Sequence, residues 1–523
     1  MKINTSLVLL YKEIHTWVGI VCGLFLFIAF YAGAITMFSP AIDQWVQNDF
    51  LHPAPMQDTP ALLTKIQEQR SDLLKNYTIT LMDADGSKSA FIGYAGGHGR
   101  RNEGASAFTA FLDDANTLQV QKINPAHTGE IINKIHQTIG LPFNHTVSEF
   151  IMGWVALLYG LALITGLIIF LPGLKKNLFA VRVGTNKKKM WLDIHNVLGV
   201  FSLPFHLIIA LTSVTFAFHD VFYAAQDALF YHHDLNKTFA SARPPATPIS
   251  KTEHVLSPPE LLNALKAQAP NFQPTSVSAQ AGPHGSLITQ VHGMDLHHPM
   301  RSLAGGFVTL DAYTGAITQK DYMPSLQSTS SALLTSFFAL HFGSFGGTAM
   351  LWAYFILGAS GAFIFYSGNI LWLETRRKKG TQAAQMPPKL SHKILSSLTV
   401  GVTSGCIAGT SAMVLAARWL SHYNQSPDVS SVILYYSVFS LCVAWAFITK
   451  PHYASWHLLG FCGLITLGIP LSNLWGTYGA QLSATSVTGT TERLIDLIAA
   501  LAACSFLFMA YKIRLKALRA SQI

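Results

Sequence analysis

Long apolar stretches alternate with polar ones along the whole chain. A membrane-spanning helix needs about 20 mostly apolar residues, and eight stretches are long enough. They cover residues 14–38, 147–172, 194–218, 338–373, 394–420, 429–449, 453–475 and 491–511. The fourth is long enough to begin outside the bilayer or to bend. The pattern predicts an all-α polytopic membrane protein with about eight transmembrane helices.

Two long polar segments, residues 39–146 and 219–337, interrupt this apolar pattern. Within them, sequences such as YTITLMDADG and GGFVTLDAYTGAITQ alternate polar and apolar residues, which is typical of short antiparallel strands. Each segment also contains one amphipathic helical pattern. Strands are expected within 77–93 and 285–319, and helices at 59–76 and 257–268. Each polar segment is therefore predicted to form a small α+β domain.

Composition and charge support a membrane location. Only 12% of the residues are charged and the mean hydropathy is +0.34, whereas soluble proteins carry about 25% charged residues. The net charge of +9 does not indicate nucleic-acid binding, because Lys and Arg gather at the ends of apolar stretches. These runs, at 175–189, 376–379 and 512–519, are expected to be cytoplasmic. Both termini are then cytoplasmic and both polar segments periplasmic.

The first apolar stretch is too long for the core of a signal peptide. We therefore expect a retained helix and a multi-pass protein of the bacterial inner membrane. The predicted divisions are a first transmembrane helix (1–38), a periplasmic insertion (39–146), helices two and three with a cytoplasmic loop (147–218), a second periplasmic insertion (219–337), helix four (338–380) and a four-helix extension (390–523). The five cysteines form no CxxC or CxxCH motif, so any haem would be bound non-covalently.

An internal repeat covers residues 11–180 and 191–379. The first and third spans open with YKEIHTWVGI and WLDIHNVLGV, each with a glycine four residues after the histidine. Each polar segment then leads to a second histidine, in NKIHQTIG and in FALHFGSFGG. TGLIIFLP follows the first of these and SGAFIFYS follows the second, and the repeat pairs these two sequences. The four histidines therefore occupy repeated positions.

The predicted topology arranges these histidines in pairs. His15 and His195 would lie at the cytoplasmic edge, and His136 and His341 at the periplasmic edge. A parallel duplication implies a pseudo-two-fold axis along the membrane normal, which would bring together the members of each pair. A single histidine at a membrane edge is commonly an interfacial residue, but four in repeated positions favour ligation of two b-type haems. Imidazole is a suitable axial ligand for haem iron.

Three further residues belong to this hypothesis. Gly19 and Gly199 lie on the same helix face as the preceding histidine, where a missing side chain would let a porphyrin approach the backbone. His206 lies in the apolar region, where ionisable groups are usually functional, although its counterpart in the first span is Leu26. His206 could replace one ligand of the outer pair, bond a haem propionate or cap a core carbonyl.

Other polar residues have simpler interpretations. His457 is interpreted as structural, and Asp496 as a partner of Arg493. Four periplasmic histidines could bind a transition metal, but their spacing fits no compact motif and favours solvated surface residues. They are His284, His292, His297 and His298.

The sequence resembles the PepSY-associated transmembrane helix family, which includes siderophore-linked ferric reductases and iron-regulated membrane proteins. HxxxG at the head of two spans, LHFG before the fourth and the VTLDAYTGAIT strand-turn carry the resemblance, over about residues 10–380. It implies periplasmic PepSY domains, four core helices and b-type haem, with haem roles for His15, His136, His195 and His341. Two features depart from the pattern. The first insertion has LDDANTLQV where DxYTG is expected, and the C-terminal extension lies outside the family core.

The favoured hypothesis is an oxidoreductase of the ferric-chelate reductase type. Electrons would pass from the haem at His15 and His195 to the haem at His136 and His341, and then to a ferric siderophore or another periplasmic ferric chelate. No GxGxxG motif occurs, so the donor would be quinol or a partner flavoprotein. One alternative is an iron or siderophore transporter, which the scarcity of intramembrane carboxylates disfavours. Another is a PepSY-based sensor or inhibitor, which would carry no pigment.

Overall fold

Among the residues that the computed structural model describes, seven helices are long and apolar enough to cross a membrane. The structure describes residues 5–47, 51–83, 85–96, 104–125, 127–174, 178, 181–182, 186–235, 237, 254–282, 286–295, 297–377, 389–423, 427–479 and 490–521. The spans are α1 (Thr5–Thr36), α5 (His145–Phe170), α13 (Gly347–Arg376), α15 (Leu390–Tyr423), α16 (Pro427–Ile448), α17 (Pro451–Gly479) and α18 (Thr490–Ser521). A bent helix pair brings the number to eight if it counts as one span. The predicted multi-pass membrane class is therefore confirmed.

The third predicted span is that bent pair. Helix α7 (Lys187–Phe201) and helix α8 (Leu203–Ala217) meet at an angle of 70°. Pro204 lies in the first turn of α8. A proline has no N–H and its ring clashes with the carbonyl four residues earlier, so α7 cannot continue through this position. The predicted span over 194–218 is therefore present as a bent pair instead of one continuous helix.

The fourth predicted span also divides, at glycines. Helix α12 (Thr329–Phe342) ends at Gly343, which has φ +66°, and α13 begins after Gly346, which has φ +67°. Glycine adopts this left-handed region without steric cost. In the first half, the short helix α4 (Thr128–Gln137) precedes α5 in the same way. The second histidine of each half therefore lies on a short helix just outside its span.

The two polar segments form one antiparallel sheet rather than two separate ones. The strands are β1 (Ala54–Pro55), β2 (Asn76–Leu81), β3 (Lys88–Ala95), β4 (Ser106–Leu112), β5 (Leu118–Ile123), β6 (Gln273–Ala281), β7 (Leu287–Met294), β8 (Gly306–Leu310) and β9 (Ile317–Gln319). Their order is β5-β4-β3-β2-β6-β7-β8-β9, and β1 pairs with β3. The contact between β2 and β6, in which Thr78 lies opposite Ser278, joins the segments. The two predicted α+β insertions therefore share one sheet, and their count as two PepSY-like domains stays a prediction.

Each half of the sheet nevertheless has its own helix and hydrophobic cluster. Helix α3 (Thr59–Gln69) packs on the first half around Ile79 and Phe91, and α11 (Pro258–Gln268) on the second around Val291 and Val308. Both helices were predicted, as were β2, β3, β7, β8 and β9. Ser257 and Glu260 form a capping box at the start of α11, which explains its sharp beginning.

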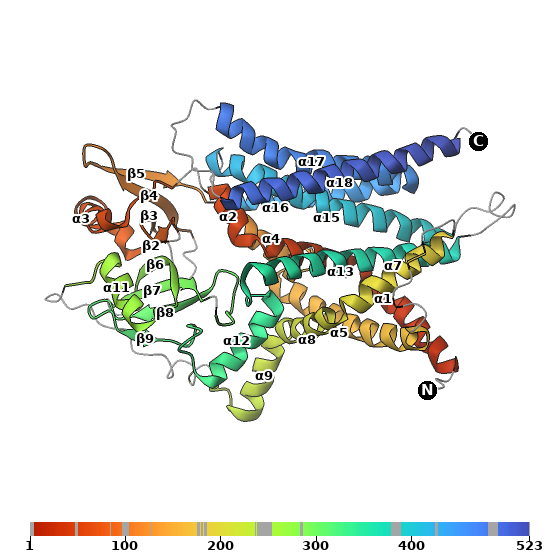
Figure 1. Cartoon of the computed structure of the whole chain (residues 1–523), viewed down its shortest axis with the longest axis horizontal. Coiled ribbons are helices and arrows are strands. Elements are labelled where there is room, and N and C mark those ends of the chain that lie inside the picture. Colours follow the sequence, from red (N-terminus) through yellow and green to blue (C-terminus); the bar gives the residue numbers. More distant parts are fainter. Residues whose placement is uncertain are drawn as a thin grey trace.

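The sheet and the membrane helices lie at opposite ends of the molecule (Figure 1). Helices α3 and α11 are farthest from the membrane bundle, and both chain ends lie at the end away from the sheet (Figure 1). Helices α2 (Ser39–Gln47) and α9 (His219–Phe230) follow the first and third spans. Helices α15 to α18 lie beside the repeated helices. Exposed apolar side chains such as Trp154, Leu441 and Leu501 imply contact with lipid.

Candidate functional site

The four repeated histidines meet in two pairs. The rings of His15 on α1 and His195 on α7 have centroids 6.2 Å apart. The rings of His136 on α4 and His341 on α12 are also 6.2 Å apart. We call the first the terminal-side pair and the second the sheet-side pair. The structure thus brings together the residues that the repeat and topology placed together.

The spacing within each pair matches two imidazoles that share one metal ion. In a five-membered ring with bonds of about 1.35 Å, a nitrogen lies about 1.15 Å from the centroid. Metal–imidazole bonds are about 2.0–2.1 Å long. Two imidazoles on opposite sides of one metal therefore have centroids about 6.3–6.5 Å apart. The observed value of 6.2 Å is close to this range.

The hydrogen bonds of the terminal-side pair leave Nε2 available on both rings. His15 Nδ1 lies 2.9 Å from the Ala162 carbonyl oxygen on α5, and His195 Nδ1 lies 3.2 Å from that of Ile364 on α13. A carbonyl only accepts, so in each neutral ring Nδ1 carries the proton. Nε2 then has a free lone pair, as a metal-binding histidine requires.

The sheet-side pair is held in the same way. His136 Nδ1 donates to the Ala29 carbonyl of α1 at 2.7 Å. His341 Nδ1 lies 2.8 Å from Thr212 Oγ1 on α8, and that hydroxyl already donates to the Ile208 carbonyl. The threonine oxygen therefore accepts from His341. Burial lowers the pKa of both His136 and His341, which keeps the rings neutral as ligation demands.

Glycines on the neighbouring helices make room for three of the rings. A Cβ atom at Gly166 would lie 2.9 Å from His15 Cε1, and one at Gly33 would lie 2.9 Å from His136 Cε1. At Gly368 the distance to His195 Cε1 would be 3.6 Å. The carbonyls that accept from His15 and His136 belong to Ala162 and Ala29. Gly166 and Gly33 lie four positions after these two residues. That spacing puts carbonyl and glycine on one helix face.

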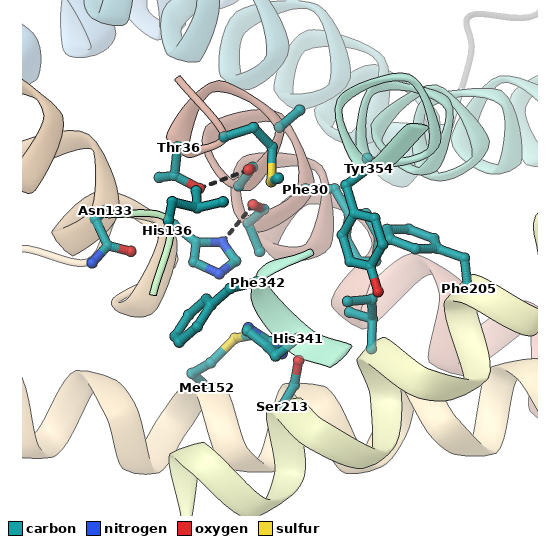
Figure 2. Close-up of a pocket in the computed structure, with 17 residues that line it drawn as sticks. Phe30, Thr36, Asn133, His136, Met152, Phe205, Ser213, His341, Phe342 and Tyr354 are labelled. Carbon is teal, nitrogen blue, oxygen red and sulfur yellow. Dashed lines mark hydrogen bonds between the residues drawn. The ribbon is translucent and has the colours of Figure 1, made fainter. Parts of the chain in front are cut away.

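A small cavity of about 70 Å³ lies beside the sheet-side pair. This volume is below the range of about 300–1,000 Å³ that is typical of ligand sites. Figure 2 shows the rings of His136 and His341 turned into this space, with Phe342 and Met152 beside them. The wall is mostly apolar, with Thr36, Asn133 and Ser213 as polar members. Gly19 and Gly199 have no atom within 4 Å of a built Cβ, so the space beside these two predicted glycines is open.

His206 belongs to neither pair. Its ring is buried among Phe30, Phe205 and Tyr159, and the Tyr159 hydroxyl lies 2.5 Å from Nδ1. Nε2 has no hydrogen-bond partner in the described part of the chain. The structure pairs His136 with His341. For His206, replacement of an outer ligand, a bond to a propionate and capping of a core carbonyl all stay predictions.

The remaining polar candidates have local partners. Trp445 Nε1 donates to His457 Nδ1 at 3.4 Å, and Asn473 Nδ2 donates to Asp496 Oδ2 at 2.6 Å. The partner found for Asp496 is thus Asn473. His292 packs against Phe307, and His298 lies 3.0 Å from Asp295, whereas His284 is outside the described residues. No group of three metal-binding side chains occurs within the described ranges.

Two site residues were missed because the repeat was aligned in the wrong register. Thr165 Oγ1 and Ser367 Oγ lie 3.4 Å and 3.0 Å from the Nδ1 atoms of His15 and His195. Each is followed by a glycine, Gly166 or Gly368. The structural counterpart of Thr165-Gly166 is therefore Ser367-Gly368, not the earlier Ser-Gly of SGAFIFYS. The signal was present as a hydroxyl residue followed by glycine shortly before a basic run.

Polar contacts outside the bilayer anchor α4, which carries His136. Gly129 N donates to Asp43 Oδ1 at 2.7 Å, and His127 contacts Asp428 through its backbone N and its Nδ1, both at 2.8 Å. Burial raises the pKa of Asp43 to about 6, against the opposing influence of Gly129 and His127. The bond to Asp428 raises the pKa of His127 despite burial. The start of α4 is thus tied to both α2 and α16.

This anchor predicts a loss of stability as pH rises. Both folded pKa values lie above the unfolded ones, so each group adds stability at low pH and loses it as pH rises through the folded value. For Asp43 the window runs from 3.8 to about 6, and for His127 it starts at 6.5. Between about pH 5 and 8, the melting temperature in detergent should fall by roughly 2–4 °C. Asp43→Asn and His127→Gln should each flatten this slope, and an unchanged slope in both would contradict the assignment.

Together, the fold and the paired histidines define a polytopic membrane protein with a sheet domain on one side of the bilayer. Residues 12–375 match the model of the PepSY-associated TM region family. Because the match covers more than half of the chain, the protein belongs to this family. No curated protein matches the chain.

Proposed function

We propose that this protein binds two b-type haems and carries electrons across the membrane to a ferric siderophore or another ferric chelate on the side of the sheet. The observation that carries the proposal is the 6.2 Å spacing of both histidine pairs, combined with Nδ1 atoms that are already bonded. If the four histidines were unrelated interfacial residues, nothing would require the same ring spacing and the same Nδ1 bonding in both pairs. One metal between each pair accounts for both features.

The surroundings of both pairs fit haem. His15 and His195 would hold one group, and His136 and His341 the other. The space beside Gly19 and Gly199 is open, and the side chains around His136 and His341 are mostly apolar, which suits an apolar macrocycle. Haem at these positions would supply a one-electron carrier on each side of the bilayer.

The chain's own groups would set the properties of these sites. The carbonyls of Ala162, Ile364 and Ala29 orient the imidazoles and raise their basicity through the Nδ1 bond. The apolar wall around His136 and His341 limits access of water, which tunes the potential of a bound metal. Donation by quinol or a partner flavoprotein, the inner-membrane location and the cytoplasmic termini belong to the same proposal.

The visible spectrum of the purified protein tests this proposal. The reduced-minus-oxidised spectrum should show b-type bands, and the pyridine haemochrome assay should give about two haems per chain, one for each histidine pair. Expression with added haem precursor ensures that porphyrin is not limiting. A colourless, folded protein from such cells would contradict the proposal and would favour a sensor or a transporter.

A further inference from the structure

One face of the sheet carries hydrogen-bonding side chains without charge. Helices α3 and α11 cover the opposite face (Figure 1). Strand pairing aligns a row of hydroxyl and amide residues across β2, β6, β7, β8 and β9. The row is Thr78, Ser278, Gln290, Thr309 and Gln319. It crosses the junction of the two polar segments and exists only because they share one sheet.

Two residues along from Gln290 and Thr309, strands β7 and β8 carry an aromatic stack. His292 on β7 lies opposite Phe307 on β8, with ring centroids 5.4 Å apart. Phe307 stacks on Tyr322 at 4.5 Å and 15°. The guanidinium of Arg301 lies 4.3 Å from the centroid of the Tyr322 ring. All four side chains are at least partly accessible, so an aromatic surface with a cation at its end faces outward.

The cation at the end of this stack makes no ion pair with a carboxylate of the described residues. Arg301 Nε donates to Thr335 Oγ1 at 2.9 Å, and Nη2 donates to the Asp321 carbonyl oxygen at 3.4 Å. The Asp321 carboxylate instead accepts from Ser331. By contrast, Arg70 lies over Phe108 at 4.8 Å but is paired with Asp72 at 2.9 Å. Of these two stacks, the one with Arg301 retains positive charge for a ligand.

The stack lies close to the sheet-side pair. Thr335 precedes His341 by six residues on α12, which is about 9 Å along the helix axis. The loop between β7 and β8 reaches the α12–α13 turn, where Met300 N donates to the Ser344 carbonyl at 3.0 Å. Leu303 of the same loop lines the cavity beside His136 and His341. A ligand on the stack would therefore sit next to the proposed exit point for electrons.

We infer that His292, Phe307, Tyr322 and Arg301 form the docking surface for the acceptor, and that this acceptor is an anionic ferric chelate with aromatic ligand groups, of the catecholate type. The inference rests on the proposed function and specifies its substrate class. Aromatic groups of the chelate would stack on Phe307 and Tyr322, and its negative charge would meet Arg301. The neutral row beside the stack would accept and donate hydrogen bonds without repelling an anion.

Binding of a redox-inert gallium(III) tris-catecholate to the purified full-length protein tests this inference. Gallium keeps the charge and shape of the ferric complex but is not reduced, so docking is measured without electron transfer. Equilibrium dialysis should show saturable binding that weakens with salt. Arg301→Gln and Tyr322→Ala should each weaken it by roughly tenfold or more. Arg70→Gln removes the paired arginine and should leave binding unchanged.

Three results would overturn the inference. The first is that the wild type shows no saturable binding. The second is that Arg70→Gln weakens binding as much as Arg301→Gln does. The third is that an uncharged gallium trihydroxamate binds as tightly as the catecholate. The haem spectrum of each sample is recorded in parallel. A protein with two haems that fails to bind the catecholate leaves the proposed function standing and removes only the docking surface. A colourless protein that binds it removes the proposed function instead.

Discussion

Replacing His341 by alanine is expected to remove one haem per chain and leave the other in place. His341 supplies one of the two imidazoles at the sheet-side pair, and iron held by a single imidazole loses half of its axial bonding. The terminal-side pair shares no ligand with it. The haemochrome content should therefore fall by about half, since we propose that each pair binds one haem. His15→Ala should give the same loss from the other site.

Redox titration distinguishes the two variants. The sites differ in their surroundings, because Thr212 holds His341 through a hydroxyl whereas Ala162 holds His15 through a carbonyl. The haem that remains in His341→Ala should thus have the reduction potential of the haem that is lost in His15→Ala. His457→Ala is the matched control, since that ring contacts Trp445 and lies in neither pair. Retention of both haems in His15→Ala and His341→Ala would refute the ligand assignment.

Pairing of the four histidines could be predicted because two independent signals agreed. In the repeat, His15 and His195 have the same neighbouring residues. The alternating direction of the spans places both members of each pair at the same edge of the membrane. Neither signal depends on side-chain packing. The partners of Nδ1 could not be predicted, because a backbone carbonyl such as Ala29 or Ile364 leaves no mark in the sequence. The hydroxyls of Thr165 and Ser367 left only a weak one.

Joining of the two polar segments into one sheet was beyond sequence reasoning for a different reason. Alternation along β2 and β7 identifies strands but not their partners, since pairing depends on contacts far apart in the chain. The contact of β2 with β6 links residues about 200 positions apart, such as Thr78 and Ser278. The bend at α8 was within reach, because Pro204 lies inside the third apolar stretch and proline breaks helices.

Enlarging a glycine next to a histidine should remove a haem although all four ligands remain. A Cβ at Gly166 would lie 2.9 Å from His15 Cε1 and 3.3 Å from Nδ1, which is closer than packed atoms allow. Valine adds two methyl groups beyond this Cβ. The His15 ring must then move away from α5 and give up its bond to the Ala162 carbonyl. Gly166→Val is therefore expected to lose most of the terminal-side haem.

Gly160 provides the matched control for this change. It lies on the same helix as Gly166, and a Cβ there has no atom within 4 Å, so Gly160→Val should keep both haems. Gly33→Val should remove the other haem, because a Cβ at Gly33 would meet His136 at 2.9 Å. A general loss of stability would lower both haems together in every variant. Selective loss from opposite sites in Gly166→Val and Gly33→Val, measured by haemochrome content and redox titration, would instead show that each glycine positions one ligand. If Gly166→Val keeps both haems at unchanged potentials, the His15 ring does not need this glycine.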